Sequence, residues 1–202
     1  MLDKIVSAWQ VTSQLEVVSV AFGLTYVILA ARENSWCWPC AFIGTGTAIV
    51  LFADGLLPME AALNVYYLVM AIYGWSQWNK GTPAEGPTLA ISSWGFQQHL
   101  ICIGVVSFLS LVSGYYLSKY SNAALPYLDS LTTWSAVITT WMVTRKILEN
   151  WLYWVVINSA SIYLYLEREF YLYAALFVIY IIIAVYGYYE WRKHFQRPTT
   201  TV

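Results

Sequence analysis

Long stretches of this sequence contain no charged side chain. They include residues 34–53, 61–79, 150–166 and 170–189. Each approaches the roughly 20 residues that a helix needs to cross a hydrocarbon core about 30 Å thick. The stretches are too long for strands and lack the alternation of a membrane barrel. We therefore expect an all-α integral membrane protein.

The composition excludes several classes of protein. Of 202 residues, 59% are hydrophobic, 18% aromatic and 10% charged, whereas a soluble domain carries about 25% charged residues. The net charge of −1 gives no basic field for phosphates or lipid headgroups. A soluble enzyme, a nucleic-acid binder and a disordered protein are excluded. The first residues have no apolar core segment, so we expect no cleavable signal peptide.

The charge pattern predicts seven membrane-spanning helices and their orientation. Two of them reach full length only if Glu16 and Asp129 enter the membrane. With the N-terminus outside, every Lys and Arg except Lys4, Lys119 and Arg168 lies on the inner side. This follows the positive-inside rule, so we expect the C-terminus in the cytoplasm. The predicted spans are 12–31, 36–54, 60–78, 98–118, 127–144, 150–167 and 170–190.

The two halves of the sequence align without a gap after a shift of 113 residues. The period contains four spans, so both three-helix units keep one orientation and are related by an axis along the membrane normal. This predicts a 3+1+3 parallel repeat: a first repeat over 12–78, a linker loop and fourth helix over 79–118, and a second repeat over 127–193. The matched pairs include Arg32 with Arg145, Trp38 with Trp151, Tyr67 with Tyr180, Gly74 with Gly187, and Glu16 with Asp129.

A few polar and aromatic side chains are expected at mid-membrane depth, where an unbonded amide is costly. Asn64 and Tyr67 share one helix face, as do Trp151, Trp154 and Asn158. Rings and an amide on one stripe suit a planar aromatic ligand that also carries hydroxyl groups. Transporters built of parallel repeats bind substrate near mid-membrane, between the halves. Further candidate substrate-binding residues are Thr45, Trp134 and Tyr180.

Structural roles compete with these assignments. Trp151 fits an interfacial aromatic belt equally well, and the Asn158 amide fits a bond between helices. Glu16 and Asp129 are suited to capping the starts of their helices or to forming an outer gate. Coupling of transport to protons is the alternative role for these two acids. Four further tryptophans at helix ends are expected in the aromatic belt: Trp36, Trp75, Trp78 and Trp191.

The sequence offers no strong catalytic or metal-binding motif. Cys37 and Cys40 form a Cys-x-x-Cys, but the motif opens an apolar helix and not a βαβ unit. His99 and His194 have no partners at ligand spacing, so we expect no metal and no cofactor. There is no phosphate-binding glycine loop and no nucleophile elbow. We therefore expect a protein that is not an enzyme.

The sequence resembles the PnuC-type nicotinamide riboside transporters over about residues 16–193. The more specific motifs are Trp-x-x-Trp, at Trp151 and Trp154, and Asn-x-x-Tyr, at Asn64 and Tyr67. Residues that extend the resemblance include Tyr26, Arg32, Asp129, Trp141, Arg145, Lys146, Glu149, Asn150, Glu190 and Trp191.

The resemblance implies a SWEET-like homotrimer in a bacterial inner membrane. It also implies uptake of nicotinamide riboside by facilitated diffusion, with trapping by a cytoplasmic nucleoside kinase. The residues that match the family's binding motifs are Asn64, Tyr67, Trp151, Trp154 and Asn158.

Other functions remain open on the sequence alone. Related transporters carry thiamine or riboflavin, and a SWEET-type sugar facilitator would share the repeat. A membrane thiol oxidoreductase would use Cys37 and Cys40, and a non-transporting receptor would fit the same composition. We expect phosphorylated nucleotides to be rejected, because no Arg or Lys lies at mid-depth.

Overall fold

The structure, a computed structural model, describes residues 14–54, 58–80, 89–121, 125–167 and 171–196. This part of the chain forms seven helices and one isolated parallel bridge between Ser92 and Ile147. The predicted all-α class is confirmed. Residues 81–88 of the predicted linker loop lie outside the described residues. The helices are α2 (Gln14–Ala31), α3 (Cys37–Asp54), α4 (Pro58–Trp78), α5 (Phe96–Tyr120), α6 (Pro126–Thr144), α7 (Asn150–Glu167) and α8 (Tyr171–Phe195).

The helix bounds follow the uncharged stretches closely, and α8 continues beyond its predicted end at residue 190. Pro126 occupies the first turn of α6, where its missing N–H costs nothing. Glu16 and Asp129 lie in the first turns of α2 and α6, where the helix dipole favours an acid. Arg192 and Lys193 lie in the last turn of α8, where it favours a base.

Six of the described helices pack as a closed ring. Helix α3 packs between α2 and α4, and α7 packs between α6 and α8. Contacts of α2 with α8, and of α4 with α6, join the two three-helix sets. The side chains that α2, α4, α6 and α8 turn toward the ring axis therefore meet side chains of the other half.

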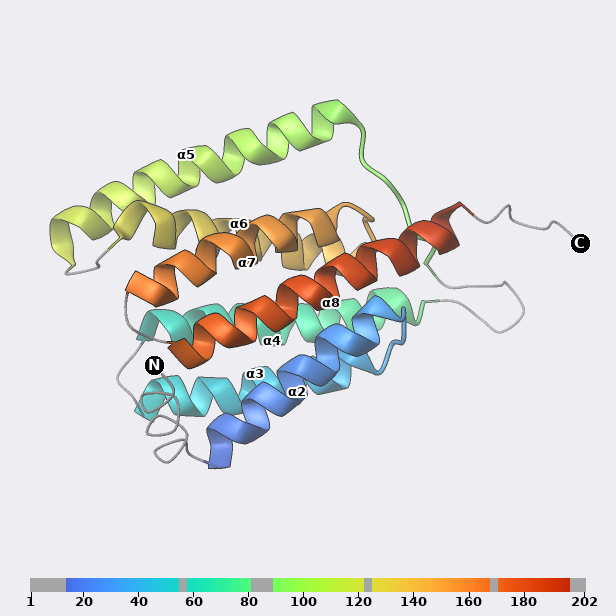
Figure 1. Cartoon of the computed structure of the whole chain (residues 1–202), viewed down its shortest axis with the longest axis horizontal. Helices are drawn as coiled ribbons and strands as arrows, with labels where there is room; N and C mark the ends of the chain where they lie inside the picture. The colour runs from blue at the N-terminus through green and yellow to red at the C-terminus, as the bar shows by residue number, and fades with distance from the viewer. Residues whose placement is uncertain (1–13, 55–57, 81–88, 122–124, 168–170, 197–202) are drawn as a thin grey trace, which may run out of the picture.

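Helix α5 stands outside this ring and packs mainly on α6 (Figure 1). It also contacts α7, where His99 Nδ1 lies 2.9 Å from the Tyr153 hydroxyl. The segment before it is tied to the second half by two backbone hydrogen bonds. The Ser92 N–H donates to the Lys146 carbonyl at 2.9 Å, and the Leu148 N–H donates to the Ser92 carbonyl at 2.8 Å. Helix α5 is thus fixed to the turn between α6 and α7.

The surface and the interior have the polarity expected of a protein in lipid. Three helices are long and apolar enough to cross a membrane by themselves, at Gln14–Ala31, Phe96–Tyr120 and Tyr173–Phe195. Phe108 and Leu111 on α5 are 65% and 63% exposed. Helix α6 instead buries polar side chains inside the bundle: Ser130, Thr132, Thr139, Thr140 and Thr144. Hydroxyl groups on a membrane helix are cheapest where other helices cover them.

Four buried tryptophans, two from each half, pack together at one end of the ring, hereafter the tryptophan end. Trp38 meets Trp78 edge to face at 5.3 Å, and Trp151 meets Trp191 in the same way at 5.4 Å. Trp78 and Trp191 lie 6.0 Å apart and join the two pairs across the axis. Because a shift of 113 residues carries one pair onto the other, the same contact is made twice.

This packing corrects one expectation. Trp78 and Trp191 were expected in a lipid-facing belt, but they are 2% and 0% exposed. Both lie at helix ends, and on those helices they turn toward the ring axis and not toward lipid. Trp36 and Trp75 do lie on the surface, 66% and 39% exposed.

Candidate functional site

Tyrosines from four helices converge inside the ring, beyond the tryptophan end. Tyr67 on α4 lies near enough to Tyr26 on α2 and to Tyr165 on α7 to interact electrostatically with both. Tyr180 on α8 interacts in the same way with Tyr165 and lies against Gly23. The structure therefore brings the candidates Tyr67 and Tyr180 into one aromatic cluster. Asn64, one turn before Tyr67 on α4, is half-buried.

Trp154 and Asn158 lie one turn apart on α7. Asn158 is 4% exposed, so its amide lies inside the bundle. Trp154 is half-buried and packs against the core cluster that contains Trp151. An amide inside a membrane bundle is costly unless it has a hydrogen-bond partner, and a ligand can provide one. This α7 face combines such an amide with a partly accessible ring.

Trp151 lies one turn before Trp154 on α7, within the tryptophan end. It is 2% exposed, which excludes a place in a lipid-facing belt. Its Nε1–H is fully buried and has no hydrogen-bond partner among the described residues, and the same is true of Trp38. Trp151 therefore closes the inner side of the α7 face below Trp154.

The repeat is broken at the candidate binding positions. The 113-residue shift pairs Trp154 with Ala41 and Asn158 with Thr45. The Thr45 hydroxyl is already bonded within its helix, donating to the Ala41 carbonyl at 2.7 Å. The shift also pairs Asn64 with Phe177. The tryptophan end and the Tyr67–Tyr180 pair are thus the same in both halves. Asn64, Trp154 and Asn158 have no counterpart of the same type in the other half.

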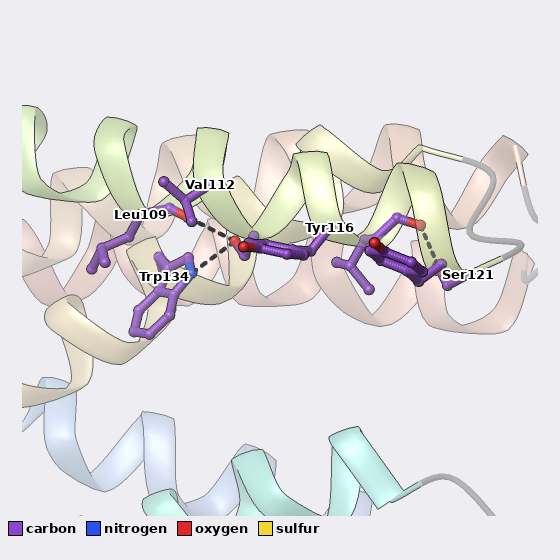
Figure 2. Close-up of a pocket in the computed structure, with 8 residues that line it drawn as sticks. Leu109, Val112, Tyr116, Ser121 and Trp134 are labelled. Atoms are coloured by element: carbon purple, nitrogen blue, oxygen red, sulfur yellow. Dashed lines mark hydrogen bonds between the residues drawn. The ribbon is translucent and has the colours of Figure 1, made fainter.

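Trp134 lies apart from the other candidates. Its Nε1 donates to the Ser113 hydroxyl on α5 at 3.0 Å, and the ring lines an apolar groove between α5 and α6 (Figure 2). The same groove is lined by Leu109, Val112, Tyr116, Leu117, Tyr120 and Ser121. Trp134 therefore joins α5 to the ring and lies on the α5 side of α6.

The two candidate acids lie at the end of the ring opposite the tryptophans. The Tyr173 hydroxyl on α8 donates to Glu16 Oε1 on α2 at 3.2 Å, and so joins the two halves there. Asp129 is half-buried in the first turn of α6. Both positions are compatible with the capping and outer-gate roles inferred from the sequence.

Cysteine and metal chemistry find little support in the described part of the chain. Cys37, Cys40 and Cys102 are free thiols, and Cys37 is buried. No three His, Cys, Asp or Glu side chains among the described residues gather at metal-binding distance.

Sequence reasoning missed several residues of the ring interior. Tyr26 was noted only as part of the resemblance, and Tyr165 was not noted. Glu33 and Lys146 form an ion pair between the halves, with Nζ–Oε2 at 3.0 Å. A signal for that pair was present, because 113 residues separate these two opposite charges.

Comparison with known protein families gives one match over most of the chain. The model of the nicotinamide mononucleotide transporter family matches residues 13–193.

Several relatives match nearly the whole chain. The riboflavin/roseoflavin transporter RibM of Streptomyces davaonensis is 24% identical over 195 residues, covering 93% of this chain and 88% of its own. The nicotinamide riboside transporter PnuC of Escherichia coli is 25% identical over 204 residues, covering 89% and 85%. PnuC of Haemophilus influenzae is 26% identical over 196 residues, covering 92% and 82%.

A solved structure is similar in fold. The crystal structure of the vitamin B3 transporter PnuC superposes with a TM-score of 0.75 at 21% identity, covering 97% of this chain and 88% of that chain. The ring of helices is therefore also the fold of a known transporter.

Proposed function

This chain belongs to the nicotinamide mononucleotide transporter family, and we propose that it carries nicotinamide riboside across the membrane by facilitated diffusion. Relatives from two bacteria that are 25% and 26% identical are nicotinamide riboside transporters. The single structural observation that carries the proposal is the α7 face, where a half-buried Trp154 precedes the buried Asn158 by one turn.

The chemistry of this face suits the proposed substrate. A nicotinamide ring linked to ribose is planar and cationic, and it stacks favourably on an indole. The carboxamide and the ribose hydroxyls both offer hydrogen bonds to the Asn158 amide. Asn64, Tyr67 and Tyr180 are proposed to complete the pocket, with Trp151 as its floor and Thr45 at its edge. The ligand has no two-fold symmetry, which favours a site to which the two halves contribute different groups.

The charge distribution favours the riboside over its phosphorylated form. The described Lys and Arg side chains lie at helix ends: Arg32, Lys80, Lys119, Arg145, Lys146, Arg192 and Lys193. A phosphate at mid-depth would lose its hydration without gaining a paired cation, which is strongly unfavourable in a low dielectric. We therefore propose the nucleoside and not the nucleotide as substrate.

Riboflavin is the second candidate, favoured by the 24% identity to RibM. Its three-ring flavin is also planar and would stack on Trp154, but it is uncharged and larger. A cation gains more from an indole face than a neutral ring does.

Transport is proposed to occur by alternating access between the repeats 12–78 and 127–193, with the segment 79–118 as their linker. The support is that the tryptophan end is closed by contacts made twice, once from each half. In parallel-repeat transporters the halves rock around a site at mid-depth. Helix α5 is proposed to move with the second repeat, because its leading segment pairs with the α6–α7 turn.

The cellular setting is proposed from charge and from the resemblance. Six of the seven described Lys and Arg lie at the tryptophan end, the exception being Lys119. The positive-inside rule supports the proposal that this end faces the cytoplasm and that the N-terminus lies outside. The resemblance supports a bacterial inner membrane. The resemblance further supports a homotrimer and a cytoplasmic kinase that traps the nucleoside.

Counterflow in proteoliposomes tests the proposal. Vesicles loaded with unlabelled nicotinamide riboside should accumulate the radiolabelled compound without ATP or an ion gradient. Thiamine or glucose inside should give no accumulation. Accumulation driven by internal riboflavin alone would reassign the substrate, and no counterflow with any of these compounds would reject a facilitator.

A further inference from the structure

Glu33 and Lys146 occupy the same position in the two halves and carry opposite charges. They are 113 residues apart, the period of the repeat. Each follows the end of a helix, α2 or α6, and each has a positive φ, 55° for Glu33 and 50° for Lys146. The hydrogen bonds of the two turns also match. The Glu33 N–H donates to the Ala30 carbonyl, and the Lys146 N–H donates to the Val143 carbonyl, both at 3.0 Å.

A left-handed residue just beyond a helix is usually glycine, because other side chains are less comfortable there. Here both positions keep a long charged side chain. The Lys146 ammonium and the Glu33 carboxylate meet across the interface, and their side chains are only 10% and 18% exposed. The Lys146 ammonium also lies 4.8 Å from the centre of the Trp78 ring.

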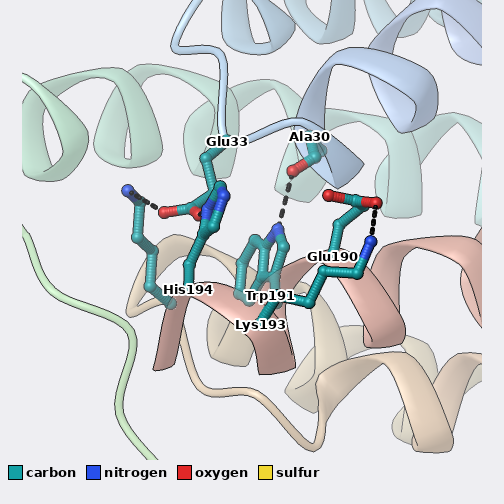
Figure 3. A network of polar contacts seen from close by, with 7 residues as sticks. Ala30, Glu33, Glu190, Trp191, Lys193 and His194 are labelled. Atoms are coloured by element: carbon teal, nitrogen blue, oxygen red, sulfur yellow. Dashed lines mark hydrogen bonds and ion pairs between the residues drawn. The ribbon is translucent and has the colours of Figure 1, made fainter. Parts of the chain in front are cut away.

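Further contacts of the same kind surround the pair (Figure 3). Trp191 Nε1 donates to the Ala30 carbonyl at 3.0 Å, from the second half to the first. Trp78 Nε1 donates to the Val143 carbonyl at 3.2 Å, from the first half to the second. The 113-residue shift exchanges these two bonds. His194 on α8 also contacts the Glu33 carboxylate.

We propose that the Glu33–Lys146 pair is a latch that holds the two halves together at the tryptophan end, and that it must open in every transport cycle. Two reciprocal indole bonds and a partly buried ion pair all connect one half to the other. Separation of the halves at this end breaks all of them together. The inference rests on the proposed transport for its purpose, but its test needs no substrate.

Cys37 reports whether the latch is open. It is 0% exposed, follows the Glu33 turn and lies close enough to Lys146 to interact with it electrostatically. We would measure the rate of Cys37 alkylation by a maleimide in the full-length Cys40→Ser protein, using mass spectrometry. Cys102, on α5 and away from the latch, provides an internal reference in the same sample.

Charge reversals separate a latch from a simple change in thiol reactivity. By charge alone, Glu33→Lys would favour the thiolate and speed alkylation, whereas Lys146→Glu would slow it. A latch predicts that both variants react faster than wild type. If loss of the ion pair raises the equilibrium constant for opening by about tenfold, the alkylation rate rises by roughly the same factor. The exchange Glu33→Lys with Lys146→Glu restores an opposite-charge pair and should return the rate to near that of wild type.

Glu190 and Lys193 provide the matched control. They form an ion pair at 2.9 Å within α8, and this pair does not connect the halves. Lys193→Glu should leave Cys37 alkylation unchanged.

If Lys146→Glu does not fold, as judged by gel filtration and Cys102 reactivity, Lys146→Gln should still react faster than wild type. The latch is rejected if the Lys146 variant reacts no faster than wild type, or if the double exchange reacts as fast as the single variants. Counterflow measured in parallel keeps that outcome separate from a failure of transport.

Discussion

Gly187 on α8 lies directly against the indole ring of Trp151 on α7. A Cβ built on Gly187 would come within 2.8 Å of the ring, and one built on Gly74 would come within 2.4 Å of the ring of Trp38. Glycine lets the helices approach closely enough for each tryptophan to be covered by backbone. The repeated contact explains why a Tyr-Gly sequence recurs with the 113-residue period.

Replacing either glycine with alanine should destabilise the tryptophan end. Gly74→Ala and Gly187→Ala each force a methyl group into an indole, an overpacking that costs about 1–3 kcal/mol. We expect a lower thermal unfolding midpoint in a single detergent for both variants. Gly104→Ala is the control, because a Cβ there meets nothing within 4 Å. Equal midpoints for all three variants would contradict this packing.

Trp154→Ala should weaken the binding of nicotinamide riboside far more than it alters stability. The loss of stacking on a cationic ring corresponds to a roughly 10- to 100-fold increase in Kd. Trp154→Phe keeps an aromatic face and should lie between the alanine variant and wild type. Calorimetric titration of each purified variant gives the three Kd values. Wild-type affinity in the alanine variant would remove Trp154 from the site.

Asn158→Ala and Thr45→Val test the asymmetry of the two halves. Asn158 is buried one turn from Trp154 and is proposed to bond to the substrate, so its loss should raise Kd roughly tenfold. The Thr45 hydroxyl is already bonded to the Ala41 carbonyl. Valine there should change Kd by less than about threefold. Equal losses in both variants, by the same titration, would mean that the two halves contribute alike.

Trp134→Phe should affect stability and leave binding alone. The substitution removes the indole bond to Ser113, which joins α6 to α5. We expect the free energy of unfolding to fall by about 1 kcal/mol. The Kd for nicotinamide riboside should stay the same. A large rise in Kd would place Trp134 in the pocket, as the sequence alone suggested.

The sequence predicted the helices well because the membrane imposes their length. The uncharged stretches mark the spans to within a few residues, and α8 differs most because its charged end at Arg192 and Lys193 remains helical. The order of packing could not be read in this way. Nothing in the sequence states that α3 and α7 lie in the middle of their halves or that α5 packs mainly on α6.

The sequence was less informative about which way aromatic side chains point. Trp75 and Trp78 lie one turn apart on α4, yet they are 39% and 2% exposed. In a chain whose helices are apolar all round, periodicity does not separate a lipid-facing ring from one on the axis. The repeat carried more information than was used. The one shift matches Trp38 with Trp151, Trp78 with Trp191 and Glu33 with Lys146, and these residues make the contacts of the tryptophan end.

Calorimetric titration of the purified protein with nicotinamide riboside and with nicotinamide mononucleotide tests the central claim most directly. The two ligands differ only by a phosphate, for which the described mid-depth residues offer no cation. Saturable binding of the riboside, with binding of the nucleotide at least about 100-fold weaker, is the predicted result. Equal or tighter binding of the nucleotide would contradict it.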